Sequence, residues 1–298
     1  MLAARPQIIF NGALTNSMTT ANAQRLSTPV ASPAFGRRRL FASTIGILVA
    51  NAVATKVIDA IALLGPAQAL VSGLGLSWAF WLSLVLCLRL ALIEEEQAAA
   101  PRDLWVCGAC LVAALVPVSP VSGFACTALA GVILLDRTQG LYLKAAAMVL
   151  LAISVQLLWS RLLMLFFVGP VADLDAHIVG LIMGTPVQGN MVGFADGSHR
   201  LSILEACTSV QNASVALMLF VAIVRTFRPK PRMSELYFLL GLFASVVAVN
   251  IVRLTLMAQN IEMFHLVHGD IGWPVINAII TVIGLLWAVL SVRREVFD

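Results

Sequence analysis

Charged residues are scarce in this chain of 298 residues. Lysine, arginine, aspartate and glutamate make up 11% of it and hydrophobic residues 60%, whereas a soluble domain carries roughly 25% charged residues. This composition excludes an ordinary soluble domain. The net charge of +4 comes from the segments between apolar runs, so it reports membrane orientation, and we expect no nucleic-acid partner.

Acidic residues are absent from residues 1–36, which are rich in Ser, Thr, Asn, Ala and Pro. Such a segment cannot form a packed core, and it predicts a flexible N-terminal tail. An internal repeat is also absent, although transporter folds are often built from repeats.

Partners for a metal or redox site are missing as well. Cys107 and Cys110 have C-x-x-C spacing, but they lie in an apolar run without a neighbouring His or Cys, which favours helix packing. Asp173, Asp175 and His177 have D-x-D-x-H spacing in a more polar segment, and we interpret them as solvated loop residues. We therefore expect neither a metal nor a cofactor.

Apolar runs of about 20 residues, the length that crosses the hydrocarbon core as a helix, recur along the chain. They predict an all-α fold, a polytopic membrane helical bundle of about eight transmembrane helices formed by residues 37–298. The expected spans are 40–64, 70–93, 104–117, 121–135, 141–166, 207–225, 235–257 and 273–292.

Basic residues orient this bundle. With a cytoplasmic N-terminus and eight crossings, fourteen Lys and Arg residues fall in cytoplasmic segments, and Arg200 is the only one in an outer loop. The positive-inside rule therefore predicts cytoplasmic N- and C-termini. Within residues 192–203, Asp196-Gly197 predicts a type I′ turn and a small extracytoplasmic β-hairpin before the span that begins at Cys207.

Three chemically active residues fall at the outer ends of these spans: Cys207, Arg253 and His268. A helix N-terminus favours the thiolate of Cys207, Arg253 can pair with a thiolate or an oxyanion, and His268 can carry a proton. Together they could run covalent acyl transfer. Taken singly, Cys207 could be a packing residue, Arg253 an interfacial side chain and His268 a loop histidine.

Four further residues are candidates for supporting roles. Glu205 is a possible partner of Arg253, and Asn250 shares a helix face with that arginine and could orient it or the next helix. Gln211 could donate a hydrogen bond to substrate or have a packing or capping role. His265 competes with His268 for the same function.

These motifs resemble those of the exosortase/archaeosortase family of polytopic membrane transpeptidases. Glu205-Ala206-Cys207 is similar to the family's E-A-C, Asn250-x-x-Arg253 to its N-x-x-R, and His268-x-x-x-Gly272-Trp273 to its H-x-x-x-G-W, which favours His268 over His265. The family usually has Ser-Gly after the cysteine, where this chain has Thr208-Ser209.

The resemblance implies a cysteine protease or transpeptidase, a hydrolase-like enzyme of the bacterial inner membrane. Its partners would be exported proteins with a C-terminal sorting signal of the PEP-CTERM kind: a short motif, an apolar helix and a basic cluster. The new carboxyl end would pass to a membrane lipid or envelope acceptor, often in exopolysaccharide systems. The alternatives are a small-solute membrane transporter and an inactive envelope or exopolysaccharide assembly scaffold.

Overall fold

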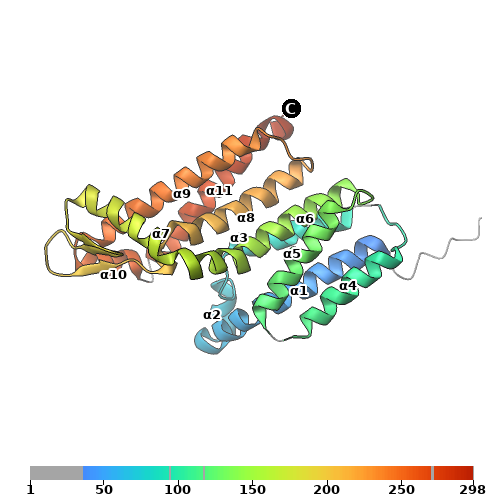
Figure 1. The fold of residues 1–298 in the computed structure, drawn as a ribbon, viewed down its shortest axis with the longest axis horizontal. Helices are drawn as coiled ribbons and strands as arrows, with labels where there is room; N and C mark the ends of the chain where they lie inside the picture. The colour runs from blue at the N-terminus through green and yellow to red at the C-terminus, as the bar shows by residue number, and fades with distance from the viewer. Residues whose placement is uncertain (1–35, 94, 117, 270–271, 298) are drawn as a thin grey trace, which may run out of the picture. The chain divides into compact units, whose positions relative to one another are not determined.

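The computed structural model describes residues 36–93, 95–116, 118–269 and 272–297. The predicted tail over 1–36 lies almost wholly outside the described residues and stays a prediction. The described chain is mostly helical (Figure 1). Its helices are α1 (Arg37–Leu64), α2 (Pro66–Val71), α3 (Trp78–Ile93), α4 (Pro101–Ala114), α5 (Ser119–Leu135), α6 (Leu141–Ser154), the π-helix η1 (Val155–Trp159), α7 (Ser160–Met183), the 3-10 turn η2 (Glu205–Cys207), α8 (Ser209–Phe227), α9 (Glu235–Met257), α10 (Ile261–His268) and α11 (Gly272–Phe297).

Proline and glycine set several helix boundaries. Pro66, Pro101 and Pro120 stand in the first turns of α2, α4 and α5, where the missing N–H would have no intrahelical partner in any case. Gly184 ends α7 in the left-handed conformation, at φ 67°, which a glycine adopts without steric cost.

Five helical stretches are long and apolar enough to cross a membrane: Arg37–Leu64, Leu141–Met183, Ser209–Phe227, Glu235–Met257 and Gly272–Arg293. The apolar helices α3 and α5 are shorter, so the expected number of about eight spans is not confirmed. The span expected at 70–93 is broken, because residues 73–75 all have positive φ and turn the chain between α2 and α3.

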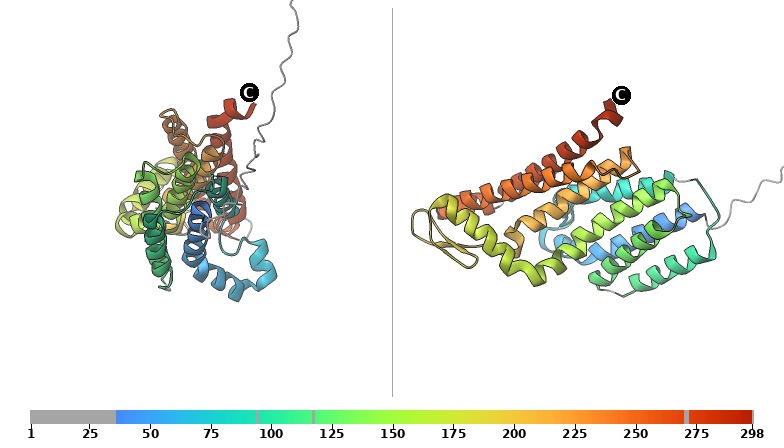
Figure 2. Two further views of the ribbon diagram at one scale, coloured as in Figure 1. Left: turned by 90° about the vertical axis from the view of Figure 1, so that its right-hand side faces the viewer. Right: turned by 45° about the horizontal axis from the view of Figure 1, so that its top comes forward.

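The longest stretch corrects the expected span at 141–166. α6, η1 and α7 form one continuous helical run of 43 residues to Met183, which at 1.5 Å per residue is about 65 Å, roughly twice the hydrocarbon thickness. Its direction changes near η1 (Figure 2). The segment that we interpreted as a solvated loop is therefore helical up to Gly184.

A small antiparallel sheet follows α7, with the order β1 (Val187–Gln188), β2 (Met191–Gly193) and β3 (Arg200–Ser202). The predicted hairpin is thus present as β2 and β3. The predicted type I′ turn is wrong, since Gly197 has φ 69° but Asp196 does not share a positive φ. The Asp196 carboxylate instead accepts hydrogen bonds from the N–H and hydroxyl of Ser198.

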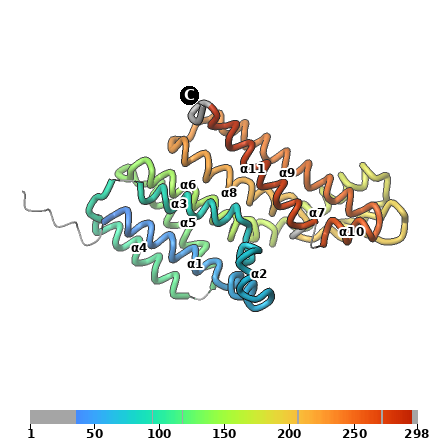
Figure 3. Tube along the Cα trace, turned by 180° about the vertical axis from the view of Figure 1, so that it is seen from behind, coloured from blue at the N-terminus to red at the C-terminus, as the bar shows by residue number. Residues whose placement is uncertain are grey.

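Three apolar clusters hold the helices together. One joins α1, α3, α4, α5 and α6, and it includes Cys107 and Cys110, which therefore pack as predicted. Another joins α8, α9 and α11; both groups of helices are visible in Figure 3. The remaining cluster joins the C-terminal part of α7, the sheet, the turn at Cys207 and the end of α9.

Candidate functional site

Cys207 ends the 3-10 turn that leads from β3 into α8. Thr208 is the N-cap residue, and α8 begins at Ser209, so the cysteine directly precedes a helix N-terminus, close to where the sequence placed it. Its side chain is 5% exposed and packs in the cluster with Val192, Ile203 and Leu254. The turn is closed by a hydrogen bond from the Cys207 N–H to the Leu204 carbonyl, 2.8 Å.

Asn250 fixes this turn from the neighbouring helix α9. It is fully buried, and its Nδ2 donates to the Cys207 carbonyl at 2.9 Å and to Ser209 Oγ at 3.2 Å. Its Oδ1 accepts from Asn212 Nδ2 at 3.0 Å. Asn250 thus holds the start of α8, the preceding helix, and none of these hydrogen bonds reaches Arg253.

Asp175 reaches the same place from α7. Its carboxylate accepts a hydrogen bond from the Ser209 N–H at 3.3 Å and lies 3.4 Å from Ser209 Oγ. The side chain is 4% exposed, so the interpretation of Asp175 as a solvated loop residue is wrong. Sequence reasoning missed this contact because Asp175 and Ser209 are 34 residues apart in the chain and no local pattern links them.

Arg253 lies one turn after Asn250 on α9 and is 1% exposed. None of its guanidinium nitrogens has a hydrogen-bond acceptor in the described part of the chain. The guanidinium stands 5.2 Å from the centre of the Trp273 ring of α11, within the range of a cation–π interaction. Asn250, one turn earlier on the same helix, donates to the Cys207 carbonyl, so Arg253 lies on the part of α9 that packs against the Cys207 turn.

His268 is the last residue of α10 and is exposed. Its ring stacks on Phe264 at 5.2 Å and 12°, and Phe264 packs against the cluster that contains Cys207. Within the described residues, no hydrogen bond joins His268 or the exposed His265 to Cys207 or Arg253. The structure therefore places Arg253 on the part of α9 that packs against the Cys207 turn, while both histidines contact the ring of Phe264.

The remaining supporting candidates make few contacts through their side chains. Glu205 is exposed, and its backbone carbonyl, rather than its carboxylate, accepts hydrogen bonds from Thr208. No ion pair between Glu205 and Arg253 forms among the residues that the structure describes. Gln211 is half-buried, and its carbonyl accepts from Ser214 Oγ at 2.8 Å.

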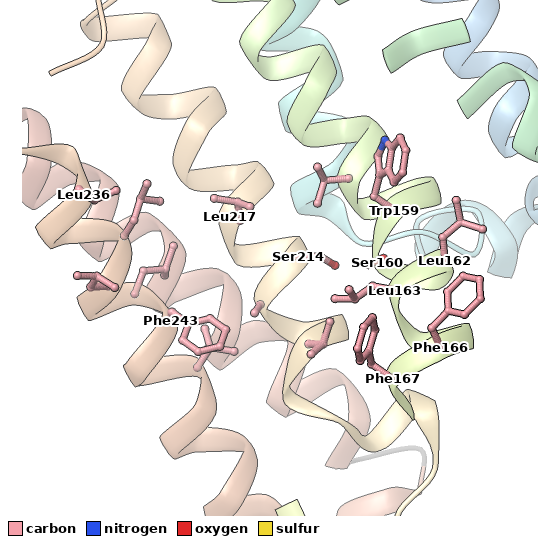
Figure 4. A pocket seen from close by; sticks show the side chains of 17 residues that line it. Trp159, Ser160, Leu162, Leu163, Phe166, Phe167, Ser214, Leu217, Leu236 and Phe243 are labelled. Carbon is pink, nitrogen blue, oxygen red and sulfur yellow. The ribbon is translucent and has the colours of Figure 1, made fainter. Parts of the chain in front are cut away.

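An apolar cavity of about 670 Å³ lies beside this site. Figure 4 shows Trp159, Phe166 and Phe167 on one side, Leu236 and Phe243 on the other, and Ser214 and Leu217 of α8 between them. Val210 and Val246 also line it; they are three residues after Cys207 and one turn before Asn250. The cavity therefore adjoins the buried polar site.

Comparisons with known proteins give no relative for this chain: no protein-family model, no curated protein and no solved structure matches it.

Proposed function

We propose that this chain is a membrane-embedded cysteine protease or transpeptidase that cleaves a C-terminal sorting signal of exported proteins. The observation that carries the proposal is the buried guanidinium of Arg253, which has no acceptor among the described residues and lies one helical turn from Asn250, the residue that bonds to the Cys207 carbonyl. A buried guanidinium without an acceptor is costly in an apolar environment. A site that develops negative charge during its reaction makes use of such a group. The resemblance of the surrounding motifs to exosortases supports the same reaction class.

The reaction would begin when the Cys207 thiol loses its proton to His268 and the sulfur attacks a peptide carbonyl carbon. Arg253 stabilises the resulting oxyanion. Collapse of the intermediate breaks the C–N bond, and the leaving amine takes the proton from His268. An amine or hydroxyl of a membrane or envelope acceptor, or water, then attacks the thioester carbonyl carbon. The C–S bond breaks, and the proton of the attacking group passes through His268 to the Cys207 sulfur.

His268 must move to take part in these proton transfers. It stacks on Phe264 in this structure, and catalytic hydrogen bonds often tighten only when substrate is bound. The imidazole of His268 is exposed, so its ring has room to rotate away from Phe264. The bound substrate chain would supply the hydrogen-bond partner for the rotated ring.

The apolar cavity supports a substrate that is itself a membrane helix. Its lining from α7, α8 and α9 is almost wholly apolar, and small side chains at Ala213 and Ser214 allow close approach of a second backbone. A helix lying there would deliver the peptide that emerges from its outer end to the adjoining Cys207. In the bacterial inner membrane, the positive-inside rule would place that end on the extracytoplasmic face.

The decisive experiment compares the wild-type chain with Cys207→Ala in cells. The substrate is a reporter that ends in a tail of short motif, apolar helix and basic cluster from the same genome. The hydrogen bonds at this position use only the backbone of Cys207, so alanine removes the sulfur and leaves them in place. We expect loss of cleavage in Cys207→Ala and normal cleavage in Cys110→Ala, which alters a buried thiol of α4.

Cleavage by Cys207→Ala at the wild-type rate would exclude the enzyme and favour a transporter or an assembly scaffold.

A second experiment tests whether the cavity binds the substrate helix. Ala213→Phe narrows it without touching Cys207, and we expect it to raise KM and leave kcat unchanged, because a substrate helix would bind less well but react at the same site.

A further inference from the structure

Asp175 is a buried carboxyl group without a cationic partner in the described part of the chain. It lies on the face of α7 that packs in the cluster around Cys207, next to Ala172, Ala176 and Val179. Removing a carboxylate from water costs several kcal/mol unless other groups compensate. Among the described residues, the compensation comes from Ser209, through its N–H and its hydroxyl.

This contact caps α8 from a different helix. The first N–H groups of a helix lack intrahelical acceptors, and a side chain at the N-cap position usually supplies one. Thr208 holds that position, but its hydroxyl donates to the Glu205 carbonyl at 2.8 Å. Asp175 supplies the acceptor instead, so the start of α8 is fixed relative to α7.

The capped serine is connected to the nucleophile by hydrogen bonds. Ser209 Oγ accepts from Asn250, and the same Asn250 amide donates to the Cys207 carbonyl. α7, α8 and α9 thus meet at the turn that carries Cys207. Within this network of described residues, Asp175 is the only member contributed by α7.

We propose that Asp175 is a positioning residue that holds the Cys207 sulfur in register with Arg253. This inference rests on the proposed function. Asp175 does not line the apolar cavity, and within the described residues its carboxyl group forms hydrogen bonds with Ser209, so it acts through Ser209 and Asn250. Misplacement of a reacting group by about 1 Å can lower a rate by roughly 100-fold, so loss of this contact should reduce kcat without changing KM.

The test uses Asp175→Ala, Asp175→Asn and a matched control, Asp173→Asn. The Asp175→Asn variant keeps an acceptor oxygen for the Ser209 N–H. Asp173 lies on the same helix, is half-buried and has no side-chain hydrogen bond in the described part of the chain. We expect a fall of about tenfold or more in kcat for Asp175→Ala with unchanged KM, a loss of less than about threefold for Asp175→Asn, and wild-type kinetics for Asp173→Asn.

A second readout works without substrate. The rate of Cys207 alkylation by iodoacetamide, followed by mass spectrometry of its peptide, reports how firmly the turn is held. We expect several-fold faster alkylation in Asp175→Ala and near wild-type rates in the other two variants, with the melting temperature of each variant recorded to exclude global unfolding. This readout tests Asp175 even where Cys207→Ala shows that the proposed function is wrong.

Two results would overturn the proposal. In one, Asp175→Ala has a wild-type alkylation rate. In the other, Asp175→Asn and Asp175→Ala have equal effects, which would mean that an acceptor for Ser209 is not what the site requires.

Discussion

Single residues account for the polar chemistry of this otherwise apolar chain. Buried polar groups are stable when their hydrogen bonds are satisfied, and Asn250, Asn212 and Ser209 follow that rule. Arg253 departs from it most, since all three of its guanidinium nitrogens lack an acceptor within the described residues, whereas Gln156 and Thr185 each lack a partner for one buried atom only. At the opposite end of the bundle, charged residues are paired, as in Arg37 with Asp103 at 2.9 Å.

Asp136, which follows α5, gives a prediction about pH. Hydrogen bonds from the Thr138 N–H and hydroxyl, then from Gln139, together with Arg102, lower the pKa of Asp136 from 3.8 to about 2. A lowered pKa contributes stability that is present above the unfolded value and is lost as the pH falls through the folded value. We expect Asp136→Ala to be less stable than wild type above about pH 4, with the difference closing towards about pH 2.

Thermal unfolding in detergent between about pH 2 and pH 7 measures this difference directly. A gap in melting temperature between wild type and Asp136→Ala that stays constant over the whole range would contradict the prediction.

Helices in this protein pack through small residues, as in other membrane bundles. At Gly241 of α9, an added Cβ would clash with the Trp287 ring of α11. The same indole donates to Ser245 Oγ at 3.1 Å. Close approach of α9 and α11 therefore depends on a missing side chain, although the sequence shows Gly241 only as one glycine in an apolar run.

Gly241→Ala tests this packing. The methyl group must displace the indole and strain its hydrogen bond, so we expect a loss of about 1–3 kcal/mol in unfolding free energy. Gly46→Ala of α1 is the control, because its Cβ would meet nothing within 4 Å and alanine is favoured in a helix interior by up to about 1 kcal/mol. Chemical denaturation in micelles measures the unfolding free energy of both variants. An equal change in the two variants would contradict the prediction, because it would show that the Trp287 ring can move aside at no cost.

At the scale of the whole described region, the long helical run bends near η1, and the apolar cavity between α7 and α9 lies beside this bend. Val155 and Trp159 of the π-helix line that cavity, and π-helical turns often occur at functional sites. The cavity and the Cys207 site adjoin, so the same arrangement of α7, α8 and α9 would serve binding and chemistry in the proposed enzyme.

Orientation in the membrane can be tested with two exposed positions, Ser198 in the turn between β2 and β3 and Lys230 in the loop between α8 and α9. The native cysteines are all buried, which favours selective labelling of a new thiol. We expect a membrane-impermeant maleimide to label Ser198→Cys in intact cells and Lys230→Cys only after permeabilisation. The reverse pattern would place the Cys207 site on the cytoplasmic side.

The sequence by itself determined the features that depend on composition and local pattern. Long apolar runs predicted membrane-length helices, and the structure has five such stretches between Arg37 and Arg293. These depend on local sequence because burial in hydrocarbon requires only sufficient length and hydropathy. Asp196-Gly197 marked the hairpin, and Cys207 was placed beside a helix start. The function inferred from the three motifs stays a prediction.

Only the tertiary structure decided which distant residues meet. It joined the Cys207 turn to Asn250 of the helix that carries Arg253 and, through Ser209, to Asp175, and it left His268 stacked on Phe264. It also continued the helix through Pro170 to Met183, where local rules favoured a loop. The physical reason is the same in each case: packing between helices and satisfaction of buried polar groups depend on contacts between segments far apart in sequence, and local propensity contains no information about them.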